Sequence, residues 1–257
     1  MDNTRNKPLA IPSGHIVIFV IIMFVQALAT FAVLALATVA PAAALSFHLG
    51  AQYVGYQVSL IYVIAAIVSL LSGTLVQRWG AALVSQFAMV LCLLGLCGLA
   101  AGHIGLLILG SLVLGAGYGL TNPAASHLLI KITPIRHRNL LFSVKQTAVP
   151  LGGVIAGLLL PVLTSFLGWQ QAFLVSCLLI IASILFIVPL RAGLDADRKP
   201  GNPITRSMMH GIRIVLSDSA LLRLSVMAFC YSATQLTLMT FAVTMLVEDL
   251  AQQLVIA

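Results

Sequence analysis

The 257-residue chain is 61% hydrophobic and only 7% charged, with a formal net charge of +7. Soluble domains carry about 25% charged residues, so this composition excludes a water-soluble globular protein and makes the lipid bilayer the solvent. Backbone groups in a bilayer need internal hydrogen-bond partners, which leaves helices or closed barrels. Because the apolar stretches are continuous rather than alternating, we predict an all-α, polytopic membrane protein.

Charges interrupt the chain rarely, and the uncharged stretches between them count the transmembrane helices. Lys, Arg, Asp and Glu are absent from residues 8–77, 79–130, 146–190 and 224–247. One span needs about 20 apolar residues, so each of the first three stretches holds two spans joined by a short hairpin, and the fourth holds one. The predicted spans are 16–44, 54–76, 82–101, 105–130, 140–165, 171–190 and 222–247.

Basic residues set the predicted orientation, because Lys and Arg are enriched in cytoplasmic loops. Of the 13 Lys and Arg residues, all but Lys145 lie before the first span or in and beside the loops that follow spans 2, 4 and 6. The alternate loops at 46–53, 102–104 and 166–170 contain none. We therefore predict a cytoplasmic N-terminus, and the positive net charge requires no nucleic-acid partner.

One long polar segment divides the chain into three predicted parts. Residues 1–190 form a transmembrane bundle of six spans, 191–221 form a cytoplasmic linker, and 222–257 hold the seventh span and the first turns of an eighth. Within the linker, the apolar spacing over 204–216 is compatible with a short surface helix and equally with an irregular loop.

The loop between spans 2 and 3 reads Gly73-Thr-Leu-Val-Gln-Arg-Trp-Gly80. It resembles the signature loop of the major facilitator superfamily, Gly-x-x-x-Asp-Arg-x-Gly followed by basic residues. Arg78 matches, whereas Gln77 stands in the place of the Asp. The resemblance implies that Gly73 lets helices pack closely, that Gly80 makes a tight turn, and that the cytoplasmic latch to which the Asp contributes is weakened or built differently. An ordinary hairpin with one topogenic arginine is the alternative.

Span 4 contains Leu-Gly-Ala-Gly-Tyr-Gly at 114–119, which resembles the glycine-rich fourth helix of the same family. Gly115 and Gly119 have the small-residue spacing that lets two helix backbones approach. Ser111 stands where the family often has an Arg, so a proton relay through that position is not predicted. Asn122 follows, and it is a candidate to line a solute path or to make a packing hydrogen bond.

Span 5 begins Phe-Ser-Val-Lys-Gln-Thr-Ala-Val-Pro-Leu-Gly-Gly at 142–153, and Gly-Trp-Gln-Gln-Ala-Phe at 168–173 leads into span 6. Both resemble bacterial transporters of the superfamily, including relatives of the cyanate-permease type. Pro150, Gly152 and Gly153 belong to this resemblance. It implies two six-helix bundles, each a 3+3 inverted repeat, around a substrate site near the midplane of a bacterial inner membrane.

Lys145 is the one Lys or Arg that falls within a predicted helix of the bundle, about 10 Å deeper than Arg138 at about 1.5 Å per residue. Intramembrane charges usually face a bundle interior or an aqueous path, so Lys145 with the neighbouring Gln146 is a candidate to attract an anionic substrate. The alternative is a lysine that snorkels to the cytoplasmic interface. Other candidate substrate-binding residues, each also able to make an ordinary helix–helix hydrogen bond, are Gln26, Tyr56, Gln57, Tyr118, Asn122 and Gln235.

These features predict a permease: a secondary transporter that moves a small solute, such as an organic or inorganic anion, by alternating access. Two bundles need about twelve spans, so we expect a product truncated after the seventh. The alternative is a transport-inactive half-transporter or membrane assembly partner, completed by a missing C-terminal half or a second subunit. The first six spans contain no Asp or Glu and so offer no carboxylate proton carrier.

Two other classes of membrane protein fit the sequence less well. A seven-helix receptor places its N-terminus outside and usually a functional Lys in span 7, which has none. A membrane enzyme is disfavoured, because the chain has no HExxH motif, no Ser/His/Asp grouping and no clustered intramembrane carboxylates. The four cysteines lie within apolar spans without metal-ligand spacing, so we predict neither a metal nor a cofactor.

Overall fold

The computed structural model describes residues 13–47, 52–198 and 212–248. Seven helices in these ranges are long and apolar enough to cross a membrane, which confirms the all-α class and the predicted number. The long helices are α1 (Ser13–Thr38), α3 (Gln52–Trp79), α4 (Ala81–Ala100), α5 (Ile104–Ile132), α7 (Ala148–Leu167), α8 (Trp169–Ile187) and α11 (Ser219–Glu248). Shorter helices are α2 (Ala40–Phe47), α6 (Arg138–Gln146), α9 (Arg191–Leu194) and the 3₁₀ turns Ile135–His137 and Val188–Leu190.

Two predicted spans are each divided into two helices, and each division is explained by its own proline. The first span, predicted as one helix over 16–44, is split between α1 and α2. Pro41 has no N–H to donate to the carbonyl of Ala37 and its ring crowds that carbonyl. The fifth span is split between α6 and α7, where Pro150 leaves the carbonyl of Gln146 without its helical donor.

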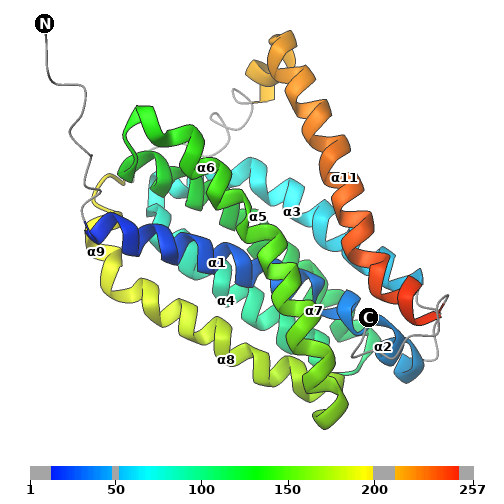
Figure 1. Cartoon of the computed structure of the whole chain (residues 1–257). Helices are drawn as coiled ribbons and strands as arrows, with labels where there is room; N and C mark the ends of the chain where they lie inside the picture. Colours follow the sequence, from blue (N-terminus) through cyan, green and yellow to red (C-terminus); the bar gives the residue numbers. More distant parts are fainter. Residues whose placement is uncertain (1–12, 48–51, 199–211, 249–257) are drawn as a thin grey trace, which may run out of the picture.

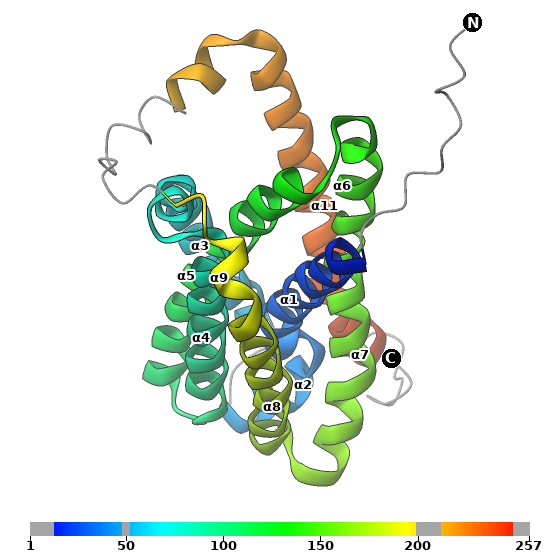
Figure 2. The same ribbon diagram turned by 90° about the vertical axis from the view of Figure 1, so that its left-hand side faces the viewer.

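Helix α1 is the centre of a six-span bundle, and the other helices pack around it (Figures 1 and 2). Every residue from Val25 to Ala40 is buried, so this part of the helix is enclosed on all sides, as expected of a helix that is apolar all round. Helices α5 and α7 flank α1, α3 packs on α5, and α4 lies between α5 and α8. Leu28, Phe31 and Leu34 of α1 are among the largest fully buried side chains.

Helix α11 leans against this bundle at one end only (Figure 1). Its residues from Ser219 to Thr234 are exposed along their length. Near its other end, the ring of Phe241 lies against Gly55 of α3, where a methyl group would collide with it. The seventh span is therefore attached to the bundle through α1, α2 and α3.

The two ends of the bundle differ in charge. The end that carries Arg78, Lys131, Arg138 and Arg191 is called the basic end, and the other, formed by α2 and the start of α3 and α5, is called the apolar end. Of the remaining sequence predictions, the basic start of the chain, residues 204–211 of the proposed surface helix and the start of an eighth span lie outside the described residues; residues 212–217 are helical.

Candidate functional site

Lys145 is turned into the bundle. Its side chain is only 2% exposed, and its ammonium donates hydrogen bonds to Oδ1 of Asn122 and, at 3.1 Å, to Oγ of Ser126. Both acceptors belong to α5, and the Nζ atom also lies 5.9 Å from the centre of the Phe142 ring. The side chain therefore does not reach for an exposed helix end, as the snorkelling alternative required.

The positive charge of Lys145 has neutral partners. Among the described residues, the ion pairs involve Asp195 and Asp197, and none involves Lys145. A buried ammonium without a counter-charge is costly, and hydrogen bonds to an amide and a hydroxyl offset only part of that cost. Asn122 itself is exposed, so the cluster of Lys145, Asn122 and Ser126 borders the surface of the bundle. Because the Asn122 amide oxygen accepts from the ammonium, the N–H donors of the same amide point away from Lys145.

Lys145 also lies beside a local irregularity of its helix, where Thr147 keeps α-helical backbone angles (φ −67°, ψ −15°) and Pro150 removes one backbone hydrogen bond. It is the penultimate residue of α6, and α7 begins at Ala148. A buried cation beside exposed amide donors is an arrangement that suits a small anion.

The other candidate residues do not join this cluster. Gln146, next in sequence to Lys145, is exposed, and Gln235 is half-buried on α11. Gln26 lies in the core of α1 at 3% exposure, and its Oε1 has no hydrogen-bond donor among the described residues. Tyr118 packs its ring edge-on against Tyr62, with 5.5 Å between the ring centres. The predicted residues are thus spread over several places.

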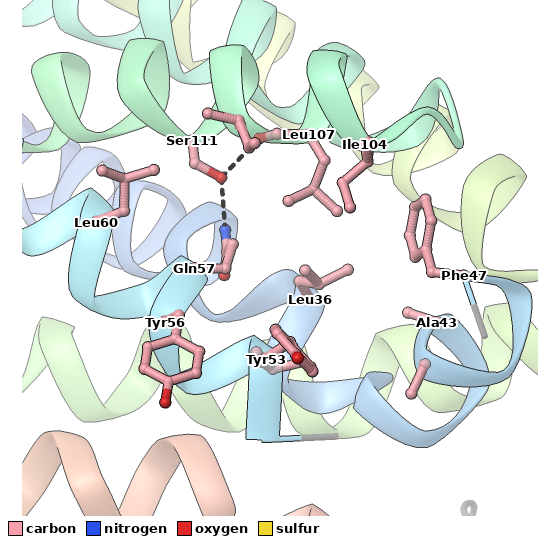
Figure 3. A pocket seen from close by; sticks show the side chains of 13 residues that line it. Leu36, Ala43, Phe47, Tyr53, Tyr56, Gln57, Leu60, Ile104, Leu107 and Ser111 are labelled. Atoms are coloured by element: carbon pink, nitrogen blue, oxygen red, sulfur yellow. Dashed lines mark hydrogen bonds between the residues drawn. The ribbon is translucent and has the colours of Figure 1, made fainter. Parts of the chain in front are cut away.

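Gln57 and Tyr56 lie at the apolar end, beside a cavity of about 230 Å³ between α1–α2, α3 and α5. Figure 3 shows Gln57 and Ser111 facing each other from α3 and α5. The Gln57 amide donates to the Ser111 hydroxyl at 3.1 Å, and that hydroxyl donates to the Leu107 carbonyl at 2.8 Å. Tyr56 is 70% exposed at the rim.

The loop between α3 and α4 is held by a carboxylate from elsewhere in the chain. Gly80 makes the predicted tight turn, with φ of 96°. Asp195, just after α9, accepts hydrogen bonds from the backbone N–H groups of Ala82 at 2.8 Å and Leu83 at 3.0 Å. It thereby caps the N-terminus of α4, which has unpaired donors and a partial positive charge. A methyl group at Gly80 would collide with this carboxylate.

Asp197 binds the segment that follows α8, which also contains Asp195, to α5. It accepts from Lys131 at 2.8 Å and from His127 at 2.9 Å, and Lys131 also donates to the Leu194 carbonyl at 2.8 Å. The hydrogen bond from Lys131, helped by that from His127, lowers the pKa of Asp197 to about 2. We call Asp195 and Asp197 with these partners the basic-end clamp. Sequence reasoning missed it, although two acidic residues in a basic segment were a visible signal.

The glycines of the sequence motifs differ in how closely a neighbouring helix packs against them. A methyl group at Gly115 or Gly119 would collide with backbone of α3, so the close packing expected at these two positions of span 4 is present. A methyl group at Gly152 would collide with the Ala27 carbonyl of α1, so α7 also packs closely on α1 there. Gly73 is different: it is exposed, and a methyl group there would meet nothing within 4 Å. The close packing expected at Gly73 is therefore not made within the described residues, because it lies on the outer face of α3.

The remaining motif residues add little to the site. Gln77 and Arg78 are exposed at the end of α3, and Gly153 is half-buried on α7. The cap on α4 is supplied by Asp195.

The sequence and the fold were compared with those of known proteins. The sequence profile of the Major Facilitator Superfamily matches residues 22–256. A peptide transporter POT in complex with sulfate has 18% identity and a TM-score of 0.60, over 92% of this chain and 50% of that one. A POT family transporter in complex with 5-aminolevulinic acid has 16% identity and a TM-score of 0.59, over 93% and 50%.

The xylose transporter XylE from E. coli, in an inward-open conformation, has 15% identity and a TM-score of 0.57, over 80% of this chain and 57% of that one. No curated protein sequence matches the chain. At these identities the likeness establishes the fold. The chain spans about half the length of the solved transporters that it matches.

Proposed function

The chain belongs to the Major Facilitator Superfamily of secondary transporters, which are not enzymes, and we propose that it takes part in moving a small anionic solute by alternating access. The observation that carries the proposal is the buried ammonium of Lys145, whose hydrogen-bond partners Asn122 and Ser126 are both neutral. A relationship to transporters of the cyanate-permease type, and an inner-membrane location with a cytoplasmic N-terminus, form part of the same proposal.

An anion is the solute class that this site selects. Two unit charges about 4 Å apart attract by about 4 kcal/mol at an effective dielectric constant of about 20. The ammonium has already lost its water on folding, so a bound anion gains this attraction without further dehydration of Lys145. A neutral solute gains no such term, and a cation is repelled.

The chemistry of the neighbours favours a small anion with oxygen or nitrogen acceptors. Asn122 is exposed beside the ammonium and can turn its N–H donors to the ligand, while Ser126 keeps Lys145 in place. The junction between α6 and α7 lies directly beside the charge, so a change in the angle between these helices moves the ammonium relative to α5. Such a movement couples occupancy of the site to the conformation of the bundle.

The proposal is tested by binding, with the chain reconstituted in lipid nanodiscs and titrated with a panel of small solutes by calorimetry. The panel pairs each anion with a neutral isostere: cyanate, formate and acetate against acetonitrile, formamide and acetamide. We expect saturable binding of at least one anion, weakening as the salt concentration rises, and none of its neutral partner. Equal binding of the anion and the neutral isostere contradicts the proposal.

A further inference from the structure

Two cysteines lie against each other across a helix–helix contact. Cys97 belongs to α4 and Cys177 to α8; they are 80 residues apart in the chain, and their Sγ atoms are 3.6 Å apart. The two helices pack side by side (Figure 2). The fold therefore brings together two thiols that the sequence keeps in separate spans.

The two thiols differ in how far a reactant can reach them. Cys177 is only 6% exposed, whereas Cys97 is half-buried. Leu94 and Leu174, which lie one helical turn before Cys97 and Cys177, are both exposed on the outside of the bundle, so the pair lies near the lipid-facing edge of the contact. A small uncharged reactant reaches Cys97 first, and Cys177 reacts through Cys97.

The surroundings favour a reaction that leaves no charge behind. A disulfide is as uncharged as the two thiols from which it forms, so the apolar environment sets no penalty against it. A disulfide bond is about 2.0 Å long, so the sulfur atoms of Cys97 and Cys177 need to approach by about 1.6 Å from their present distance of 3.6 Å. Rotation about the two Cα–Cβ bonds supplies a movement of this size.

We propose that Cys97 and Cys177 are a redox modification site, at which a small uncharged peroxide such as hydrogen peroxide forms a disulfide between α4 and α8. The Cys97 sulfur attacks one peroxide oxygen, the O–O bond breaks, and the other oxygen leaves with the thiol proton as water, so that Cys97 becomes a sulfenic acid. The Cys177 sulfur then attacks the Cys97 sulfur, the S–O bond breaks, and that oxygen leaves with the Cys177 proton as a second water. The two thiols lose two electrons, which the peroxide accepts.

The disulfide adds a second attachment between α4 and the α8 segment. Asp195, which follows α8 and α9, already binds the start of α4 at the basic end. Cys97 lies near the opposite end of α4, which ends at Ala100, so oxidation joins the two helices towards both ends. A cross-link between residues so far apart in the chain restricts the unfolded state and thereby stabilises the fold. The reaction does not involve Lys145 and so does not depend on the proposed function.

The test uses the whole chain in nanodiscs, treated with hydrogen peroxide. Free thiols are then blocked with N-ethylmaleimide, and disulfides are mapped by mass spectrometry of peptides. We expect a cross-linked peptide that contains both Cys97 and Cys177, and a rise of about 5–10 °C in the unfolding temperature that dithiothreitol reverses. The proposal is overturned if the two cysteines do not join at a peroxide concentration that oxidises the exposed Cys230, or if they join without raising the unfolding temperature.

Variants assign the two steps to the two cysteines. Cys177→Ala should stop the reaction at the sulfenic acid of Cys97, which dimedone traps, whereas the unmodified chain should give little of this adduct. Cys97→Ala should leave Cys177 as a free thiol. Cys230→Ala is the matched control, because Cys230 is exposed on α11, and it should form the same disulfide as the unmodified chain. Equal amounts of the Cys97 adduct with and without Cys177 contradict the pairing, whether or not Lys145 binds an anion.

Discussion

Replacing Lys145 with Gln removes the one buried cation of the described bundle and keeps a polar side chain of similar length. Attraction to an anion about 4 Å away is about 4 kcal/mol at an effective dielectric constant of about 20. The anion must shed part of its own hydration to enter, which takes back some of this energy. We therefore expect a net loss of about 1.4–2.8 kcal/mol, or a 10- to 100-fold weaker Kd.

The assay is calorimetric titration of the best-binding anion into the chain in nanodiscs, repeated at low and high salt. Lys145→Arg keeps the charge and should lose less affinity than Lys145→Gln, although the guanidinium fits Asn122 and Ser126 less well than the ammonium. Arg136→Gln is the charge-matched control, since Arg136 is exposed at the basic end and is screened by salt. The reasoning is refuted if Lys145→Gln binds the anion as tightly as the unmodified chain, or if Arg136→Gln loses as much.

Three further predictions concern stability, each measured by thermal unfolding in detergent. Asp195→Ala removes the cap of α4 and should lower the free energy of unfolding by about 1 kcal/mol. The control Asp218→Ala removes a similar cap from α11, outside the bundle, and should leave the unfolding transition of the bundle unchanged. Equal effects of the two substitutions contradict the role of Asp195 in the basic-end clamp. The pKa of Asp197 is lowered from 3.8 to about 2, so its stabilisation is complete above pH 3.8 and is lost as the pH falls towards 2. Asp197→Asn should flatten the stability profile in that window, and an unaltered profile argues against the pair with Lys131. Gly119→Ala should cost about 1–3 kcal/mol because the methyl group collides with α3, whereas Gly157→Ala, which meets nothing within 4 Å, should be neutral or stabilising.

The number and position of the spans could be predicted because the cost of a charge in lipid is large and local. The four uncharged stretches are long enough for seven spans, and the seven predicted spans match seven helices. The divisions at Pro41 and Pro150 were missed because hydropathy measures how long a stretch stays apolar, not whether its hydrogen-bond ladder is continuous.

The candidate site could be predicted in part. The sequence places Lys145 in the bundle, but an inward-facing and a snorkelling lysine have the same hydropathy, and the choice depends on Asn122 and Ser126 of a different helix. Asp195 lies 113 residues from Ala82, which it caps. Such a contact depends on how α8 packs on α4, which the local pattern around Gln77 does not encode.

The most direct measurement of the central claim is the side-chain NMR signal of Lys145 during an anion titration. The chain contains only a few lysines, so labelling them with ¹⁵N gives few signals, and Lys145→Gln identifies the one of interest. We predict that the Lys145 signal alone shifts as the anion is added, with the same Kd that calorimetry gives. If the anion binds while the Lys145 signal stays in place, the buried ammonium is not the anion site.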